Sequence, residues 1–293
     1  MLIDSFLDYL RYERNYSENT IVGYGEDIAQ LREYIQEENV SFDPAEVEPA
    51  QIREWVIYLM NAGYAASSVN RKLSSLRSFY RFLLRRGEVT KNPLLKIVAP
   101  KKKKALPVFY KESDMEKVLD VTNYDDDFWG CRDRLILEMF YSTGIRLSEL
   151  VNLNNADVDI FSLQLKVTGK RNKQRLIPFG DVLKELILRY IDKRNEEFFG
   201  ETAAFFLNKK GERLSKKSVY VLVKKNLSGV VTQKKRAPHA LRHTFATAML
   251  NGGAELGAVK DLLGHSSLAA TEVYTHTTFE ELKKNYKQAH PRA

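Results

Sequence analysis

Apolar residues recur at intervals of three and four along the first third of the chain, and this spacing predicts helices. Pro49 suits the first turn of one of them. Ser67 or Ser68 is a candidate N-cap for the next, which is expected to end at Gly87. Residues 1–97 are therefore predicted to form a bundle of four or five helices.

The pattern changes in the middle of the chain, where short alternating runs predict strands between two groups of helices. Ahead of the strands, Ser113 is a candidate N-cap for a helix over 113–121. A second helix, over 132–142, is expected to end at Gly144. The predicted strands are Val158–Phe161, Gln164–Thr168 and Gln174–Pro178, and the last two form a hairpin. Helices are expected over 181–199, 215–228, 239–251, 255–264, about 268–274 and 279–288. The expected fold class is mainly α (α+β), with one small antiparallel sheet.

A basic segment separates the two parts. Residues 98–110 contain prolines that interrupt a helix and the run Lys101–Lys104, whose like charges keep the chain extended. We therefore expect a domain on each side of this linker, over 1–97 and over 111–293.

The net charge of +8 is unevenly distributed. Residues 1–100 hold 12 Lys/Arg and 14 Asp/Glu, so the other 34 basic and 24 acidic side chains give the remainder a net charge of +10. The second part is thus the stronger candidate for a surface that binds a polyanion such as DNA or RNA, although charge alone also fits a basic protein without that role.

Composition excludes several classes. A single cysteine rules out an intrachain disulfide and a cysteine-rich zinc site. No apolar run approaches the ~18 residues of a transmembrane helix, and the N-terminus carries acids where a signal peptide is basic. We expect a cytoplasmic protein that does not enter a membrane.

The stretch from Pro238 to His276 carries the candidate chemistry: two imidazoles, one guanidinium and one phenol, from His239, His265, Arg242 and Tyr274. Together these groups suit attack on a phosphodiester without a metal. Each alone has a structural explanation. A histidine after Gly264 is consistent with a helix cap, and most tyrosines are half-buried packing residues.

The order of short motifs is more specific than any one residue. T-G-I-R-x-x-E-L (143–150) is followed by a hairpin G-K (169–170), then H-x-L-R-H (239–243), L-L-G-H (262–265) and Y-T-H, which begins at Tyr274. With these motifs the chain resembles the tyrosine site-specific recombinases of the phage-integrase family, and most closely their Xer subgroup (XerC/XerD). The resemblance extends to Y-S-E-N-T-I-x-x-Y-x-x-D-I, to S-x-x-N-R-K-L-S-S-L-R-S-F-Y-R-F-L and to the closing H-P-R-A.

The resemblance implies catalytic roles. Arg146 and Arg242 would hold the non-bridging oxygens of the scissile phosphate, with His265 as a third donor. Tyr274 would be the nucleophile and His239 the group that accepts its proton.

Two further groups complete the implied site. Lys170 would protonate the leaving 5′ oxygen, with Lys173 as a weaker rival, and Arg171 stands where a glycine is common in the family. Glu149 would orient an active-site arginine or histidine. No cofactor, metal or ATP is implied.

DNA contacts are expected from basic side chains in both domains and the linker. Residues 1–97 would form a core-binding, SAM-like DNA-binding domain, whose fourth helix exposes a basic face. The candidates are Arg71, Lys72, Arg77, Lys101, Lys102, Lys103, Lys104, Arg171 and Lys173. A solvated helix face is the alternative explanation for the first three.

The implied function is recombination at a double-stranded DNA site through a 3′-phosphotyrosyl intermediate, with resolution of chromosome or plasmid dimers as the role. The expected partners are a homo- or hetero-tetramer with a second Xer-like recombinase, and a DNA translocase as activator. Residues 277–293 are expected to dock into a neighbouring subunit, with packing on their own domain as the alternative. The alternatives for function are a mobile-element integrase, a type IB topoisomerase and a non-catalytic architectural DNA-binding protein.

Overall fold

The structure is a computed structural model that describes residues 2–37, 42–101, 108–122, 124–169, 173–231, 236–264 and 279–293. The chain forms two compact units, Met1–Ala105 and Leu106–Ala293, and the division falls within the predicted linker. The helix predicted near 268–274 lies outside the described residues.

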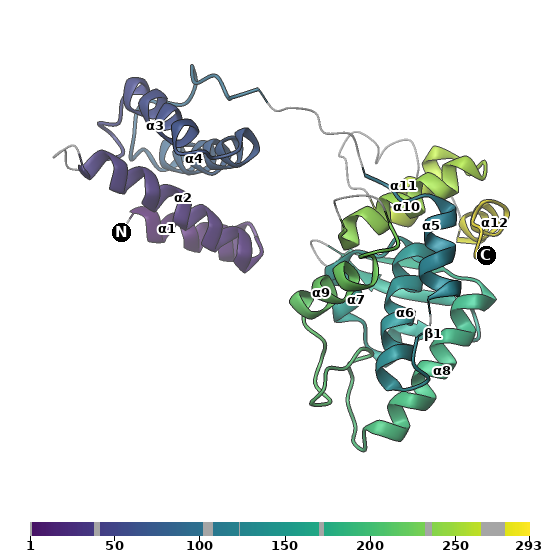
Figure 1. The fold of residues 1–293 in the computed structure, drawn as a ribbon. Helices are drawn as coiled ribbons and strands as arrows, with labels where there is room; N and C mark the ends of the chain where they lie inside the picture. Colours follow the sequence, from purple (N-terminus) through teal and green to yellow (C-terminus); the bar gives the residue numbers. More distant parts are fainter. Residues whose placement is uncertain are drawn as a thin grey trace. The chain divides into compact units, whose positions relative to one another are not determined.

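The first unit is built from helices (Figure 1). They are α1 (Leu2–Asp8), which continues into the π-helical turn η1 (Tyr9–Glu13), α2 (Glu18–Glu37), α3 (Pro49–Asn61) and α4 (Ala66–Arg86). The predicted helix start at Pro49 and the stop at Gly87, which has φ +73°, are confirmed. The predicted cap of α4 was wrong. Ala65 is the N-cap, because its carbonyl accepts the first helical N–H groups and places Ser67 and Ser68 inside the first turn.

The N-terminal motif that ends in D-I, on α2, meets the motif that contains N-R-K-L, on α4. They meet at Asp27, whose carboxylate is fully buried. Arg71 donates to both of its oxygens at 2.6 and 2.8 Å, Lys72 donates at 3.0 Å and Ser75 at 2.8 Å. Lys72 is buried, so its assignment to a solvent-facing basic surface was wrong. Helical spacing placed it correctly on α4 but did not reveal the buried carboxylate that α2 brings to it.

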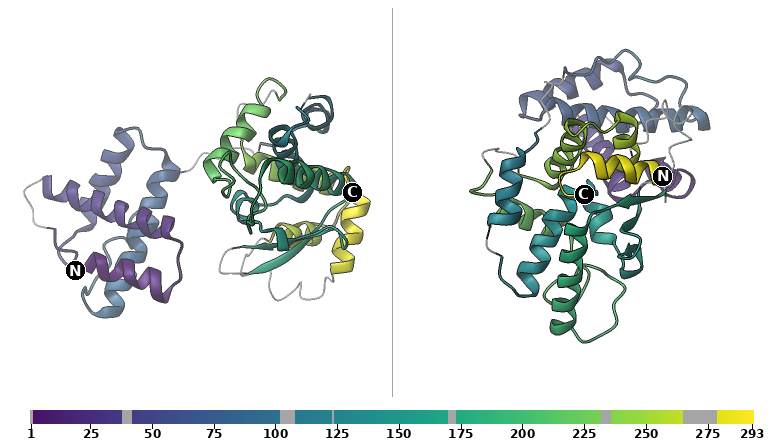
Figure 2. Two further views of the ribbon diagram at one scale, coloured as in Figure 1. Left: turned by 90° about the horizontal axis from the view of Figure 1, so that it is seen from below. Right: turned by 90° about the vertical axis from the view of Figure 1, so that its right-hand side faces the viewer.

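The second unit contains two groups of helices with a small sheet between them in the chain (Figure 2). Its first helices are α5 (Glu112–Glu116), the π-helical η2 (Lys117–Val121), α6 (Phe128–Thr143), α7 (Leu147–Asn152) and the 3₁₀ turn η3 (Asn155–Asp157). After the sheet come α8 (Asp181–Glu197), α9 (Lys216–Asn226), α10 (Pro238–Asn251), α11 (Leu256–Leu263) and α12 (Phe279–Ala289). Lys111, not Ser113, is the N-cap of α5, because the extended backbone at Lys111 sets the helix start.

The sheet has the order β1–β2–β3 and is antiparallel throughout. Strands β2 (Gln164–Thr168) and β3 (Gln174–Pro178) have the predicted bounds, and their register pairs Val167 with Arg175. β1 is shorter than predicted, at Val158–Asp159, because the Asp159 carboxylate accepts from two backbone N–H groups and starts a turn. The predicted fold class, mainly α-helical with a small antiparallel sheet, is confirmed.

Helix α6 is the centre of this unit. All nine side chains from Leu135 to Thr143 are buried, and the helix packs against α8 and α10. Burial on every side is typical of a helix enclosed by its neighbours. Because α6 is fixed in this way, the residues that follow Gly144 leave it from a rigid position.

Helix α12 packs on its own unit, against α10, α11 and β3. Tyr286, Ala289 and His290 are buried, and the His290 ring bonds the Tyr141 carbonyl at 3.1 Å. A single chain does not test docking of 277–293 into a neighbour, so that expectation stays a prediction.

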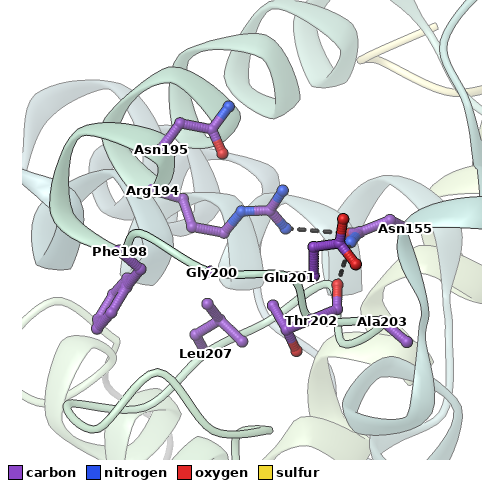
Figure 3. A pocket seen from close by; sticks show the side chains of 9 residues that line it. All are labelled: Asn155, Arg194, Asn195, Phe198, Gly200, Glu201, Thr202, Ala203 and Leu207. Carbon is purple, nitrogen blue, oxygen red and sulfur yellow. Dashed lines mark hydrogen bonds between the residues drawn. The ribbon is translucent and has the colours of Figure 1, made fainter.

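A polar pocket of about 610 Å³ lies where the end of α8 meets the loop that follows it (Figure 3). Arg194 and Asn155 bond to each other across it at 2.8 Å. Of the predicted catalytic residues that the structure describes, none lines this pocket. In the parts of the chain that the structure describes, no helix is long and apolar enough to cross a membrane.

Candidate active site

Arg146 is held at the corner between α6 and α7. It is the N-cap residue of α7, and Glu149 is the third residue of that helix. The Glu149 carboxylate accepts from the Arg146 backbone N–H at 2.9 Å and from its guanidinium at 2.7 Å. The R-x-x-E spacing is therefore a helix cap whose carboxylate also fixes the arginine side chain.

Arg242 approaches the same corner from α10. It is buried, and its guanidinium donates to the Gly144 carbonyl at 2.6 Å and to the Leu263 carbonyl at 2.5 Å. His239, three residues earlier on α10, is exposed. Helical spacing gives the two side chains one face of the helix, with the imidazole toward solvent.

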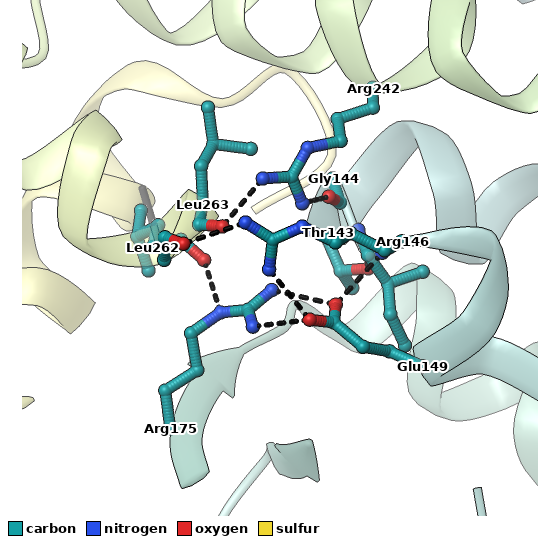
Figure 4. Close-up of polar contacts among 10 residues, drawn as sticks. Thr143, Gly144, Arg146, Glu149, Arg175, Arg242, Leu262 and Leu263 are labelled. Atoms are coloured by element: carbon teal, nitrogen blue, oxygen red, sulfur yellow. Dashed lines mark hydrogen bonds and ion pairs between the residues drawn. The ribbon is translucent and has the colours of Figure 1, made fainter. Parts of the chain in front are cut away.

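A third arginine, which the sequence reasoning missed, completes this group (Figure 4). Arg175 on β3 donates to both oxygens of Glu149, at 2.8 and 2.9 Å, and its Nε donates to the Leu262 carbonyl at 2.8 Å. The available signal was strand alternation. Arg175 shares a strand face with the buried Ile177, and a charged side chain on a buried face needs a partner.

The three guanidinium groups converge on the end of α11. Arg175, Arg242 and Arg146 donate to three successive carbonyls, those of Leu262, Leu263 and Gly264. The last carbonyls of a helix have no partner within the helix and carry partial negative charge. The end of α11 thus serves as a platform on which the arginines are aligned.

The pKa values of Glu149 and Arg242 are both lowered, for different reasons. Burial alone raises the pKa of the Glu149 carboxyl, but hydrogen bonds and charge from Arg175, and then Arg146, lower it from 4.5 to about 2. Burial, followed by repulsion from Arg146 and Arg175, lowers the pKa of Arg242 to about 9. Three guanidinium groups around one carboxylate leave an excess of positive charge, which an anion would offset.

Two family models match the chain. The phage integrase family matches residues 109–281, and the phage integrase N-terminal SAM-like domain matches residues 3–87. The chain belongs to the phage integrase family. The arginine cluster lies within the first of these matched regions.

Curated relatives refine the assignment. Tyrosine recombinase XerC of Staphylococcus saprophyticus is 41% identical over 292 residues, which cover 99% of this chain and 97% of that protein. XerC of Chlorobaculum tepidum is 38% identical over 317 residues, which cover 99% of this chain and 94% of that protein. The chain is thus a Xer-like, site-specific tyrosine recombinase and a DNA strand-transfer enzyme.

Solved structures share the fold. The Tn1549 transposon integrase in complex with circular intermediate DNA has a TM-score of 0.71 at 22% identity, over 97% of this chain and 98% of that one. The XerH recombinase bound to difH in a pre-cleavage complex has a TM-score of 0.70 at 20% identity, over 96% of this chain and 83% of that one.

Part of the predicted site of this recombinase lies outside the described residues: Lys170, Arg171, His265 and Tyr274. The structure brings together Arg146, Arg242 and Glu149. It also places Gly169 and Gly264, the neighbours of Lys170 and His265 in the chain, beside this group. A Cβ built on Gly169 would lie 3.4 Å from the Glu149 carboxylate, and the Gly264 carbonyl accepts from Arg146 at 2.6 Å.

The side chains predicted to contact DNA differ in their exposure and in their partners within the protein. Lys101 and Lys173 are exposed, Arg71 is half exposed and bonded to Asp27, and Arg77 donates to the Ile97 carbonyl. Lys102–Lys104 lie outside the described residues. The sequence reasoning did not single out α9, which exposes basic side chains at both ends: Lys216, Lys217, Lys224 and Lys225.

Proposed function

We propose that this recombinase cleaves and rejoins DNA with Tyr274 as its nucleophile. The Tyr274 oxygen bonds to the phosphorus, the bond to the 5′ oxygen breaks, and a 3′-phosphotyrosyl linkage with a free 5′ hydroxyl results. His239 accepts the phenol proton and Lys170 donates a proton to the leaving oxygen. A 5′ hydroxyl from another strand reverses these steps, and because a phosphoester is kept throughout, no ATP is required.

The observation that carries this proposal is the convergence of Arg146 and Arg242 on the end of α11. A guanidinium has five N–H donors, so each arginine retains donors beyond the carbonyl and carboxylate bonds described above. Negative charge grows on the non-bridging phosphate oxygens in the transition state. Two fixed guanidinium groups stabilise that charge more than the ground-state charge, which accelerates the reaction.

Contacts to the DNA backbone are proposed for the exposed lysines of α9 and for the lysines of the linker. Phosphate contacts release counterions, so affinity for DNA falls as salt rises. Replacing Lys216 and Lys217 by alanine is expected to reduce the slope of log affinity against log salt by about 1 for each lysine. An unchanged slope would remove α9 from the DNA interface.

For the biological role, we propose resolution of chromosome or plasmid dimers by a tetramer on a recombination site, with a second Xer-like recombinase as partner and a DNA translocase as activator. The support is identity of 38–41% to proteins named XerC and fold likeness to recombinases bound to DNA. A mobile-element integrase is the second candidate, since the transposon integrase has the same fold. A plasmid with two directly repeated sites tests the choice. Excision without integration between separate plasmids supports dimer resolution, and efficient integration supports the alternative.

The central experiment looks for the covalent intermediate. A binding site is first selected from a random duplex library. A nick placed a few nucleotides on the 3′ side of the cleavage position then allows the short fragment that carries the free 5′ hydroxyl to diffuse away. Wild type is expected to give a protein–DNA adduct resistant to denaturant, and Tyr274→Phe is expected to give none. Tyr12→Phe, which removes an exposed phenol from the other unit, is the matched control. An adduct that survives Tyr274→Phe would overturn the assignment of the nucleophile.

A further inference from the structure

Arg175 joins three elements of the catalytic unit. It lies on β3, its Nη atoms bind Glu149 of α7, and its Nε binds the Leu262 carbonyl of α11. Its side chain is only 14% exposed. Through this one planar group the hairpin, α7 and α11 are held in a single geometry.

Arg175 also completes the coordination of Glu149. The two carboxylate oxygens accept four hydrogen bonds, two from Arg146 and two from Arg175. A carboxylate has about four acceptor sites, so this buried group is saturated. Without Arg175, two of those sites would be unpaired, and the carboxylate would be held by Arg146 alone.

The end of α11 is in close contact with the same guanidinium. A Cβ built on Gly264 would lie 3.1 Å from both Cδ and Nη1 of Arg175. Gly264 has φ +61° and presents its carbonyl to Arg146. Arg175 therefore contacts both groups that bind the Arg146 guanidinium, the Glu149 carboxylate and the turn at Gly264.

We propose that Arg175 is a positioning residue for the recombination reaction, which holds Glu149 and the end of α11 so that the Arg146 guanidinium stays aligned with the scissile phosphate. The proposal rests on the function proposed above. Arg175 acts through Arg146, so its loss slows cleavage rather than DNA binding. Misplacement of a catalytic group by about 1 Å costs roughly 100-fold in rate.

The test compares single-turnover adduct formation at saturating protein with DNA affinity measured separately. Arg175→Lys keeps the charge but loses the fork, and Arg175→Gln keeps part of the shape. Both are expected to cleave about 100-fold more slowly than wild type with affinity changed less than about threefold. Arg213→Lys is the matched control. Arg213 also bonds backbone carbonyls of α7 and of the residue after it, but it does not contact Glu149, so a rate within about threefold of wild type is expected.

A double variant separates positioning from a general structural role. If Arg175 acts through Arg146, Arg146→Lys with Arg175→Lys is no slower than Arg146→Lys alone, whereas independent effects multiply. Wild-type rates in Arg175→Lys and Arg175→Gln, or multiplied defects in the double variant, would overturn this inference and leave the proposed function intact. A wild-type chain that forms no adduct would overturn both.

Discussion

Glu149→Gln tests whether the charge of one buried carboxylate stabilises the catalytic unit. The Glu149 side chain is 1% exposed, and its pKa is lowered from 4.5 to about 2. One pKa unit corresponds to about 1.4 kcal/mol, so the ionised carboxylate contributes roughly 3 kcal/mol to the free energy of unfolding at neutral pH. Glutamine removes that charge and points an amide N–H group toward a guanidinium.

The pH dependence follows from the direction of the shift. Because the pKa is lower in the folded state than in the unfolded state, the stabilisation is complete above about pH 5 and is lost as the pH falls toward 2. The deficit of Glu149→Gln is therefore expected to be about 3 kcal/mol at pH 7 and about half of that at pH 3.

Unfolding in urea, followed by tryptophan fluorescence, measures this deficit in the full chain. The protein has two tryptophans, Trp55 in the first unit and Trp129 in the second. A Trp55→Phe background leaves Trp129 as a probe of the catalytic unit alone. The reasoning would be refuted by a deficit below about 1 kcal/mol at pH 7, or by an equal deficit at both pH values.

Three more predictions concern single positions in the two units. Burial raises the pKa of Glu138, so wild type loses stability as the pH rises above about 4.5. Glu138→Gln is therefore expected to stabilise the protein and to unfold at a higher urea concentration than wild type at pH 7. A lower urea midpoint would contradict this. Asp27→Asn leaves Lys72 buried without its charge partner, so the free energy of unfolding of the first unit is expected to fall by about 3–5 kcal/mol. Trp55 fluorescence in a Trp129→Phe chain measures this loss, and a value below about 1 kcal/mol would refute the prediction. Gly264→Ala places a side chain on a left-handed backbone, in close contact with Arg175. Adduct formation is expected to slow by about tenfold at unchanged DNA affinity. A wild-type rate would show that the turn tolerates a side chain.

Local features of the site could be predicted from the sequence. Arg146 and Glu149 belong to one short motif and to one helix cap, which involves only residues within one turn, so their proximity needs no distant contact. The bounds of β2 and β3 were correct for the same reason, since alternation and a short turn define a hairpin locally. The resemblance to recombinases added the roles that no spacing could supply.

Contacts between distant segments were decided by the tertiary structure. Arg175 was missed because its partners, Glu149 and Leu262, belong to two other elements and meet it only after the hairpin packs on α7 and α11. Lys72 was misplaced because its buried partner, Asp27, is on another helix.

By itself, the sequence determined most of the helices and the hairpin, because periodicity is a property of neighbouring residues, and its resemblance to recombinases singled out Arg146 and Arg242. Only the tertiary structure decided which charged side chains are paired in the interior and which are exposed to solvent. Burial makes an unpaired charge costly, and whether a partner is present depends on how elements pack, not on their order along the chain.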